Sequence, residues 1–124
     1  MLLRKGLALC IAIAALLFLG SFVPPIEAGQ VTLHIVDVDA HEGVQVWVPS
    51  SITVKKGDTV TLVLVNHLLE EHGYEIEAVG VKEVVGNHQT KTVTFKATKA
   101  GIFPIKCQLH KAENHYAGQL VVLE

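Results

Sequence analysis

The chain has 124 residues, a formal net charge of −2 at pH 7, and a composition in which half of the residues are hydrophobic. It contains no run of basic residues, and its one arginine, Arg4, lies near the N-terminus. A chain of this charge lacks the basic surface that binds nucleic acid or anionic membranes, so neither partner is expected.

The first 28 residues have the layout of a secretory signal peptide. Arg4 and Lys5 form a short basic region, residues 7–23 are almost wholly apolar, and Ala28 offers a small residue at a cleavage point. We therefore predict export to the periplasm or an equivalent compartment, with residues 29–124 as one soluble domain after cleavage. Because the apolar run is at the short edge of what spans a bilayer, an uncleaved membrane anchor is the alternative.

The remainder of the chain alternates apolar and polar residues with a period of two, as β-strands do, and shows no long helical pattern. The positions that share one face in successive runs are Val31, Leu33 and Ile35; Val44, Val46 and Val48; Val60, Leu62 and Leu64; His72, Tyr74, Ile76 and Ala78; Val93, Phe95 and Ala97; and Phe103, Ile105 and Cys107. Seven or eight short strands of this kind predict an all-β fold, a sandwich or small barrel. Pro104 lies inside one run and indicates an edge strand or a bulge, because proline cannot donate to a ladder.

A thiol and two imidazoles occur together near the end of the chain, at Cys107, His110 and His115. Cys10 leaves with the signal peptide, so Cys107 is the one thiol of the exported domain and has no disulfide partner within it. Alone, Cys107 fits a buried structural cysteine. The two histidines that follow it lie in a segment without a strand pattern and are free to turn back toward the thiol. A thiolate with imidazoles suits copper, zinc or iron, so the cluster predicts a metal site.

A fourth donor is expected from His72, which begins a strand whose inward face continues with Tyr74 and Ile76. Alone it fits a satisfied core histidine, but with a Cys-x-x-His loop elsewhere it becomes the next candidate ligand. The weaker candidates in the loop before it are His67, Glu70 and Glu71. The histidines predicted to be solvated surface residues are His34, His41 and His88, and Asn66 is expected to end a strand by ordinary turn chemistry.

The order Asn66, His72-Gly73-Tyr74 and Cys107-x-x-His110 before the last strand resembles the cupredoxins. The segments 54–58, 78–85, 99–101 and 107–115 are more similar to nitrosocyanin, the red-copper branch of that family. This resemblance implies a Greek-key β-sandwich or barrel and one mononuclear copper per chain, bound by Cys107, His110 and His115. The resemblance to nitrosocyanin implies a glutamate at the position where this chain has His72, whereas blue cupredoxins normally have a histidine there. The resulting predicted metal set is His72, Cys107, His110 and His115.

Two absences narrow the chemistry of such a site. Met1 is the one methionine and is lost with the signal peptide, which excludes the weak axial thioether of ordinary blue copper sites. A binuclear centre with two bridging thiolates is excluded because the exported domain has a single cysteine. A third nitrogen donor in place of methionine is expected to favour Cu(II) and to lower the reduction potential relative to a blue site.

Several functions are compatible with this site. The first is electron transfer with a redox partner protein, which we favour slightly. The second is redox chemistry on a small molecule such as nitric oxide at an open copper position, as the nitrosocyanin resemblance implies. Copper delivery or storage and a structural zinc domain are further alternatives. The same resemblance implies a homotrimer.

Overall fold

The computed structural model describes residues 23–24, 27–111, 115–116 and 118–124. Most of the predicted signal peptide therefore lies outside the described residues. No helix within the described ranges is long and apolar enough to cross a membrane.

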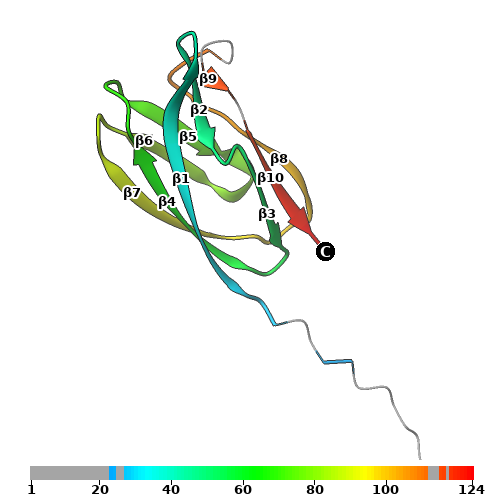
Figure 1. Cartoon of the computed structure of the whole chain (residues 1–124). Helices are drawn as coiled ribbons and strands as arrows, with labels where there is room; N and C mark the ends of the chain where they lie inside the picture. Colours follow the sequence, from blue (N-terminus) through cyan, green and yellow to red (C-terminus); the bar gives the residue numbers. More distant parts are fainter. Residues whose placement is uncertain (1–22, 25–26, 112–114, 117) are drawn as a thin grey trace, which may run out of the picture.

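The described residues form ten strands and one short 3-10 turn (Figure 1). In chain order these are β1 (Gln30–His41), β2 (Val44–Val48), β3 (Ser51–Lys55), β4 (Thr59–Asn66), β5 (His72–Ile76), η1 (Glu77–Val79), β6 (Val81–Val85), β7 (Thr90–Lys96), β8 (Gly101–Ile105), β9 (His115–Tyr116) and β10 (Gly118–Leu123). The prediction of an all-β chain is thus confirmed, with more strands than the seven or eight expected.

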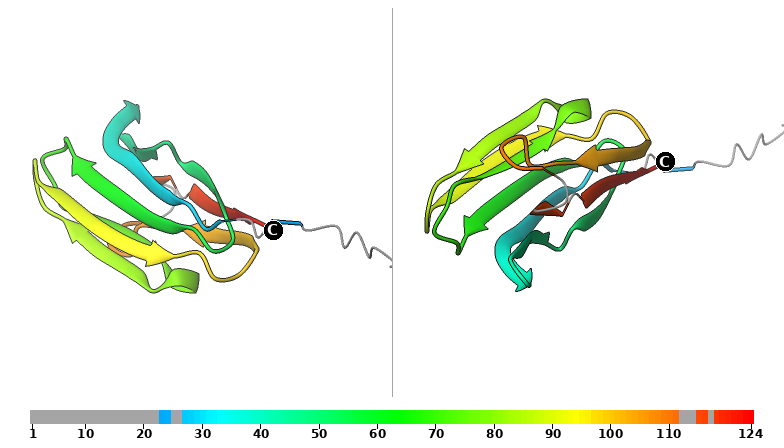
Figure 2. Two further views of the ribbon diagram at one scale, coloured as in Figure 1. Left: turned by 90° about the horizontal axis from the view of Figure 1, so that it is seen from below. Right: turned by 90° about the horizontal axis from the view of Figure 1, so that it is seen from above.

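The strands form two layers with the apolar core between them (Figure 2). One layer is a five-stranded sheet in the order β7-β4-β1-β2-β9, in which β1 is central and pairs in parallel with β4. The other contains the sheet β3-β10-β8 and the hairpin β5-β6, which an isolated bridge between Glu75 and Lys106 joins. The fold is the predicted single-domain β-sandwich.

The period-two pattern correctly predicts which face of most strands is buried. Val60, Leu62 and Leu64 of β4 are all fully buried, and Ile105 and Cys107 are 3% and 8% exposed. Pro104 lies on β8, which is an edge strand of its sheet as predicted. These apolar faces pack together into one core, so the domain has a hydrophobic basis for stability that does not depend on a disulfide.

The pattern fails at two places. In β2 the buried residue is Trp47, at 3% exposure, while Val44 and Val48 of the opposite parity are exposed. The run from His72 stops at Ile76, and Ala78 is exposed in η1 because the chain turns there into Gly80, whose φ is 70°. The alternation shows which face of a strand is apolar. Which face is buried depends also on the parts of the fold that cover the sheet.

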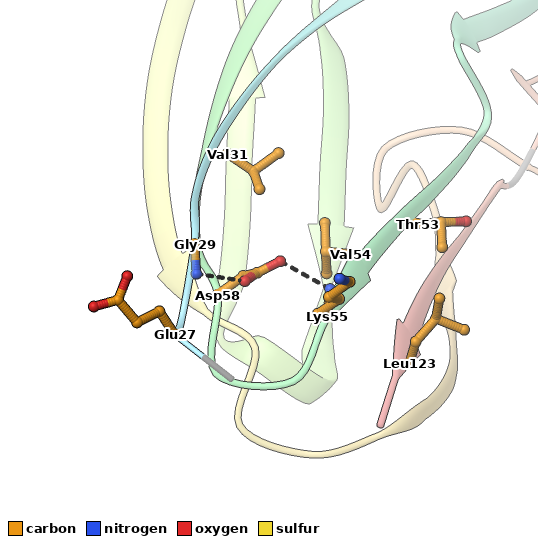
Figure 3. Close-up of a pocket in the computed structure, with 8 residues that line it drawn as sticks. All are labelled: Glu27, Gly29, Val31, Thr53, Val54, Lys55, Asp58 and Leu123. Atoms are coloured by element: carbon orange, nitrogen blue, oxygen red, sulfur yellow. Dashed lines mark hydrogen bonds between the residues drawn. The ribbon is translucent and has the colours of Figure 1, made fainter. Parts of the chain in front are cut away.

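The end of the sandwich near the C-terminus is held by a buried carboxylate. Asp58 accepts hydrogen bonds from the backbone N–H of Gly29 at 2.8 Å and of Lys55 at 2.9 Å (Figure 3). These bonds, that of Lys55 first, hold the pKa of Asp58 below its ordinary value. A surface pocket of about 380 Å³ opens here, and the described residues that line it include no histidine or cysteine.

We predict that Asp58→Asn lowers the melting temperature at neutral pH, because the neutral amide is a weaker acceptor for the two N–H groups. The folded pKa of Asp58 lies below its unfolded value, so its contribution is present above the unfolded pKa and is lost as pH falls through the folded pKa. Thermal melts from neutral pH to about pH 2 should show the two proteins converging on acidification. Asp39→Asn, at an exposed position of β1, is the control. A difference that persists unchanged to the acid limit would contradict the prediction.

Candidate metal centre

Three buried donors meet at the end of the sandwich where β9 lies, opposite to the C-terminus (Figure 1). His72 begins β5, Cys107 follows β8, and His115 belongs to β9. One imidazole nitrogen from each histidine and the Cys107 Sγ all lie within 4.8 Å of one another. The side chains of His72 and His115 are completely buried. Residues from three separate segments of the chain thus converge on one point of the fold.

The placement of His115 differs from the prediction in one respect. It does not lie in an irregular loop, because β9 pairs in parallel with β2 and sets His115 beside Gln45. A two-residue strand is too short to show any periodicity, so the sequence pattern could not reveal it. The pairing holds His115 on the sheet rather than on a free loop.

His110 lies at the edge of the cluster. Its Nδ1 atom is 3.3 Å from the Cys107 Sγ, and its ring centroid is 4.8 Å from that of His72 and 6.1 Å from that of His115. Its side chain is 27% exposed, and its Nε2 lies 4.0 Å from a carboxylate oxygen of Glu70. Of the four predicted ligands, His110 is therefore the one through which the cluster reaches solvent.

The loop before His72 is fixed by Asn66, the last residue of β4. The Asn66 side chain donates from Nδ2 to the carbonyls of Glu70, Val85 and Gly86, and its Oδ1 accepts from the Leu68 N–H at 2.8 Å. This is the turn chemistry expected of Asn66, carried out by a fully buried side chain. By holding the loop at both ends, Asn66 determines where β5 begins and hence where His72 lies.

The backbone of Gly73 reaches the thiol directly. Its N–H donates to the Cys107 Sγ at 3.2 Å, and its carbonyl accepts from the Trp47 indole N–H at 3.0 Å. The Trp47 ring packs edge-on against Tyr74, with ring centroids 5.3 Å apart. A hydrogen bond to sulfur stabilises the thiolate relative to the thiol, and the thiolate is the form that binds metal. By bonding to the Gly73 carbonyl, the buried Trp47 helps to hold in place the Gly73 N–H that faces the sulfur.

The cluster fits a metal ion because its polar atoms lack other partners. Both ring nitrogens of His72 and the Nδ1 of His115 are buried without a hydrogen-bond partner among the described residues. Metal–nitrogen and metal–sulfur bonds of about 2.0–2.3 Å let the donors of one ion lie up to about 4.5 Å apart, so a set within 4.8 Å needs little movement. Unpartnered buried polar groups are costly, and a bound ion would remove that cost.

Electrostatics favours the neutral, metal-binding form of His72. Burial lowers the pKa of the His72 imidazole below its ordinary value, and the nearby His115 and His110 act in the same direction, while Asp37 opposes them. At neutral pH the His72 ring is therefore uncharged and has a lone pair available for a ligand bond. Burial also raises the pKa of Tyr74, which stays neutral beside the cluster.

The sequence pattern missed one residue of this cluster, Asp37. It is completely buried on β1, and its Oδ2 lies 3.0 Å from the His115 Nε2 and 3.5 Å from the His72 Nδ1. The sequence does contain an indication of its burial. Asp37 follows Leu33 and Ile35 at a spacing of two, so its side chain lies on the same face of β1 as theirs. An aspartate on the buried face of a strand is unusual enough to indicate a functional or paired site.

The weaker candidates lie on the surface. His67, Glu70 and Glu71 are exposed, and only Glu70 approaches the cluster, through its contact with His110. The histidines expected to be solvated, His34, His41 and His88, are all exposed. The two histidines that are buried among the described residues, His72 and His115, belong to β5 and β9.

Comparison with known proteins defines the class of protein. A family profile described as the cupredoxin-like domain matches residues 9–122. The chain therefore belongs to the cupredoxin-like family. It is also similar to a nitrous-oxide reductase of Cupriavidus necator, with 42% identity over 57 residues, which amount to 44% of this chain and 9% of that relative. The chain thus matches only a small part of that relative's length.

We predict that Gly73→Ala disturbs the thiol end of the cluster. A Cβ at position 73 would clash with the Gln108 side chain and would lie 3.0 Å from its backbone nitrogen. Overpacking of this kind costs about 1–3 kcal/mol, measured as the free energy of unfolding in a denaturant titration. Adding Gln108→Ala should recover part of this loss by removing the side-chain clash. Equal stability of Gly73→Ala and the wild type would show that the clash is relieved without cost.

Proposed function

We propose that the protein is an exported cupredoxin that binds one copper ion per chain and acts in electron transfer. The observation that carries this proposal is the convergence of the Cys107 Sγ with buried nitrogens of His72 and His115, all within 4.8 Å. A thiolate combined with imidazoles is a donor set that suits copper. Bound copper would supply one-electron redox chemistry, and the residues determine how electrons reach it and how the donors are held.

His110 is the proposed route for electrons. It contacts the Sγ atom at 3.3 Å and is partly exposed, whereas His72 and His115 are sealed from solvent. Leu109 beside it in sequence is 42% exposed, and Leu69, next to Glu70, is 77% exposed. Apolar side chains around an exposed imidazole suit a brief encounter with a redox partner protein, since little desolvation of charge is needed.

The fold supports electron transfer by limiting movement of the donors. His72 lies on β5, His115 on β9, and Cys107 directly follows the Glu75–Lys106 bridge that joins β5 to the segment after β8. Each donor is therefore tied to a strand or to its immediate extension. Donors that keep one geometry in both oxidation states make electron transfer fast, because little rearrangement accompanies it.

A second function, redox chemistry on a nitrogen oxide, is favoured by the partial similarity to a nitrous-oxide reductase. It is also what a nitrosocyanin-like protein would do, and it requires an open coordination position. Of the four candidate ligands His110 is the most exposed, with a side chain that is 27% accessible, so a small molecule would have to enter on its side. Nitric oxide or azide should shift the optical spectrum of the copper-loaded protein in this case and leave it unchanged for a closed electron carrier.

The other hypotheses have less support. A structural zinc domain would need the metal to fold, yet this chain has a continuous core of buried residues from both layers. Copper delivery or storage is less favoured because the donors are buried and tied to strands, which hinders rapid transfer of an ion. Export, removal of the signal peptide and assembly into a trimer complete the proposal, and mass spectrometry of the secreted protein would test the first two.

We predict that the protein purified without its signal peptide binds one equivalent of Cu(II) and gains a thiolate-to-copper absorption band with a copper EPR signal. Cys107→Ser should abolish the band, because the charge-transfer donor is gone, while His88→Ala at an exposed turn should change nothing. A colourless protein that retains one equivalent of zinc and gives no copper EPR signal would overturn the copper proposal.

We predict that His72→Glu moves the absorption of the copper-loaded protein toward that of red copper sites, because it introduces the glutamate of nitrosocyanin at a buried position of the proposed ligand set. The matched control is His67→Glu, which places the same side chain in the exposed part of the loop. An unchanged spectrum in His72→Glu would remove His72 from the ligand set.

A further inference from the structure

Among the described residues, Asp37 is the carboxylate that reaches the candidate metal centre from inside the core. It is completely buried, and its Oδ2 lies 3.0 Å from the Nε2 of His115. The same oxygen is 3.5 Å from the Nδ1 of His72, while Oδ1 has no hydrogen-bond partner among the described residues. A buried carboxylate with only imidazoles beside it is costly unless it serves those imidazoles.

We propose that Asp37 is a positioning residue that determines which nitrogen of His115 faces the metal. A carboxylate can only accept a hydrogen bond, and a neutral imidazole has one N–H group. The contact with Asp37 therefore places the proton on Nε2 of His115 and leaves the lone pair on Nδ1. This inference rests on the proposed function, in which His115 is a copper ligand.

The free nitrogen is in the right state for this role. The Nδ1 atom of His115 is buried and has no hydrogen-bond partner among the described residues. His115 is also in the group of donors that lie within 4.8 Å of one another, whereas Asp37 is outside that group. Asp37 thus acts on the metal through His115, in the way that carboxylates commonly orient metal-binding histidines.

Asp37 is paired on both sides within a sheet. It lies on β1, the central strand of the five-stranded sheet. There it is in register with Trp47 of β2 on one side and with Asn66 of β4 on the other. Trp47 bonds to the carbonyl of Gly73, and Asn66 bonds to the loop before His72. The three paired residues Asp37, Trp47 and Asn66 therefore position His115, the N–H group that faces the thiol, and that loop.

The charge of Asp37 has a second consequence. Together with a Cys107 thiolate it gives the site two negative charges, which balance Cu(II) and exceed the charge of Cu(I). Asp37 therefore favours the oxidised ion, and removal of its charge should raise the reduction potential. This effect adds to that of a nitrogen ligand in place of methionine.

The test uses the exported domain with Asp37→Val, Asp37→Asn and the control Asp39→Asn, an exposed aspartate two residues along the same strand. The first measurement is the tautomer of His115 in the copper-free protein, from long-range proton–nitrogen NMR correlations. The second is the Cu(II) dissociation constant, and the third is the EPR spectrum and reduction potential of the copper-loaded protein.

We expect His115 to be protonated on Nε2 in the wild type and to lose this preference in Asp37→Val. The dissociation constant of Asp37→Val should rise about 10–100-fold, as is typical when the partner of a metal-binding histidine is removed. Asp37→Asn keeps an acceptor oxygen, so its dissociation constant should rise less while its reduction potential still increases. Asp39→Asn should behave as the wild type.

Two results would overturn the inference: protonation of His115 on Nδ1 in the wild type, or a copper affinity of Asp37→Val within about twofold of the wild type with an unchanged EPR spectrum. A crystal structure of the copper-loaded protein with a direct bond from copper to Asp37 would also overturn it. If the wild type binds no copper, the proposed function fails. The tautomer of His115 in the copper-free protein then still shows whether Asp37 accepts a hydrogen bond from Nε2 of His115.

Discussion

The structure depends on the burial of polar side chains at one end of an otherwise apolar core. Asp37, His72 and His115 are completely inaccessible to solvent, and Cys107 nearly so. Each would lose several kcal/mol of hydration if left unpaired in such a place, so their coexistence requires that they satisfy one another or share an ion. The opposite end carries Asp58, whose two carboxylate oxygens each accept a backbone N–H, whereas Oδ1 of Asp37 has no hydrogen-bond partner among the described residues.

The buried polar residues can contact one another because the strands that carry them end at the same end of the sandwich. β1, β5 and β9 each contribute one buried donor or acceptor, and the two layers meet at this end through the core that Trp47 and Tyr74 share. Cys107 directly follows β8, and His110 is the partly exposed member of the group. Strands therefore hold the buried histidines in place while one imidazole reaches the surface, which is the arrangement that the proposed electron transfer needs.

Much of the fold was predictable because local and global preferences agree in it. The alternation in β4 and the run that ends in Cys107 match the faces that are buried. The prediction failed at β2, where Trp47 rather than the valines is buried, because the choice of face depends on the layer above and not on the strand itself. It also missed β9, since two residues cannot show a period.

The sequence alone determined the donors that are available. After residue 28 it contains one thiol, no methionine, and histidines spaced as in a cupredoxin loop, and these facts define the chemistry of any metal bound there. Only the tertiary structure decided which donors meet and what orients them. Asp37 and His115 are 78 positions apart, and no local pattern can report a contact that exists only because β1 and β9 flank the same strand, β2.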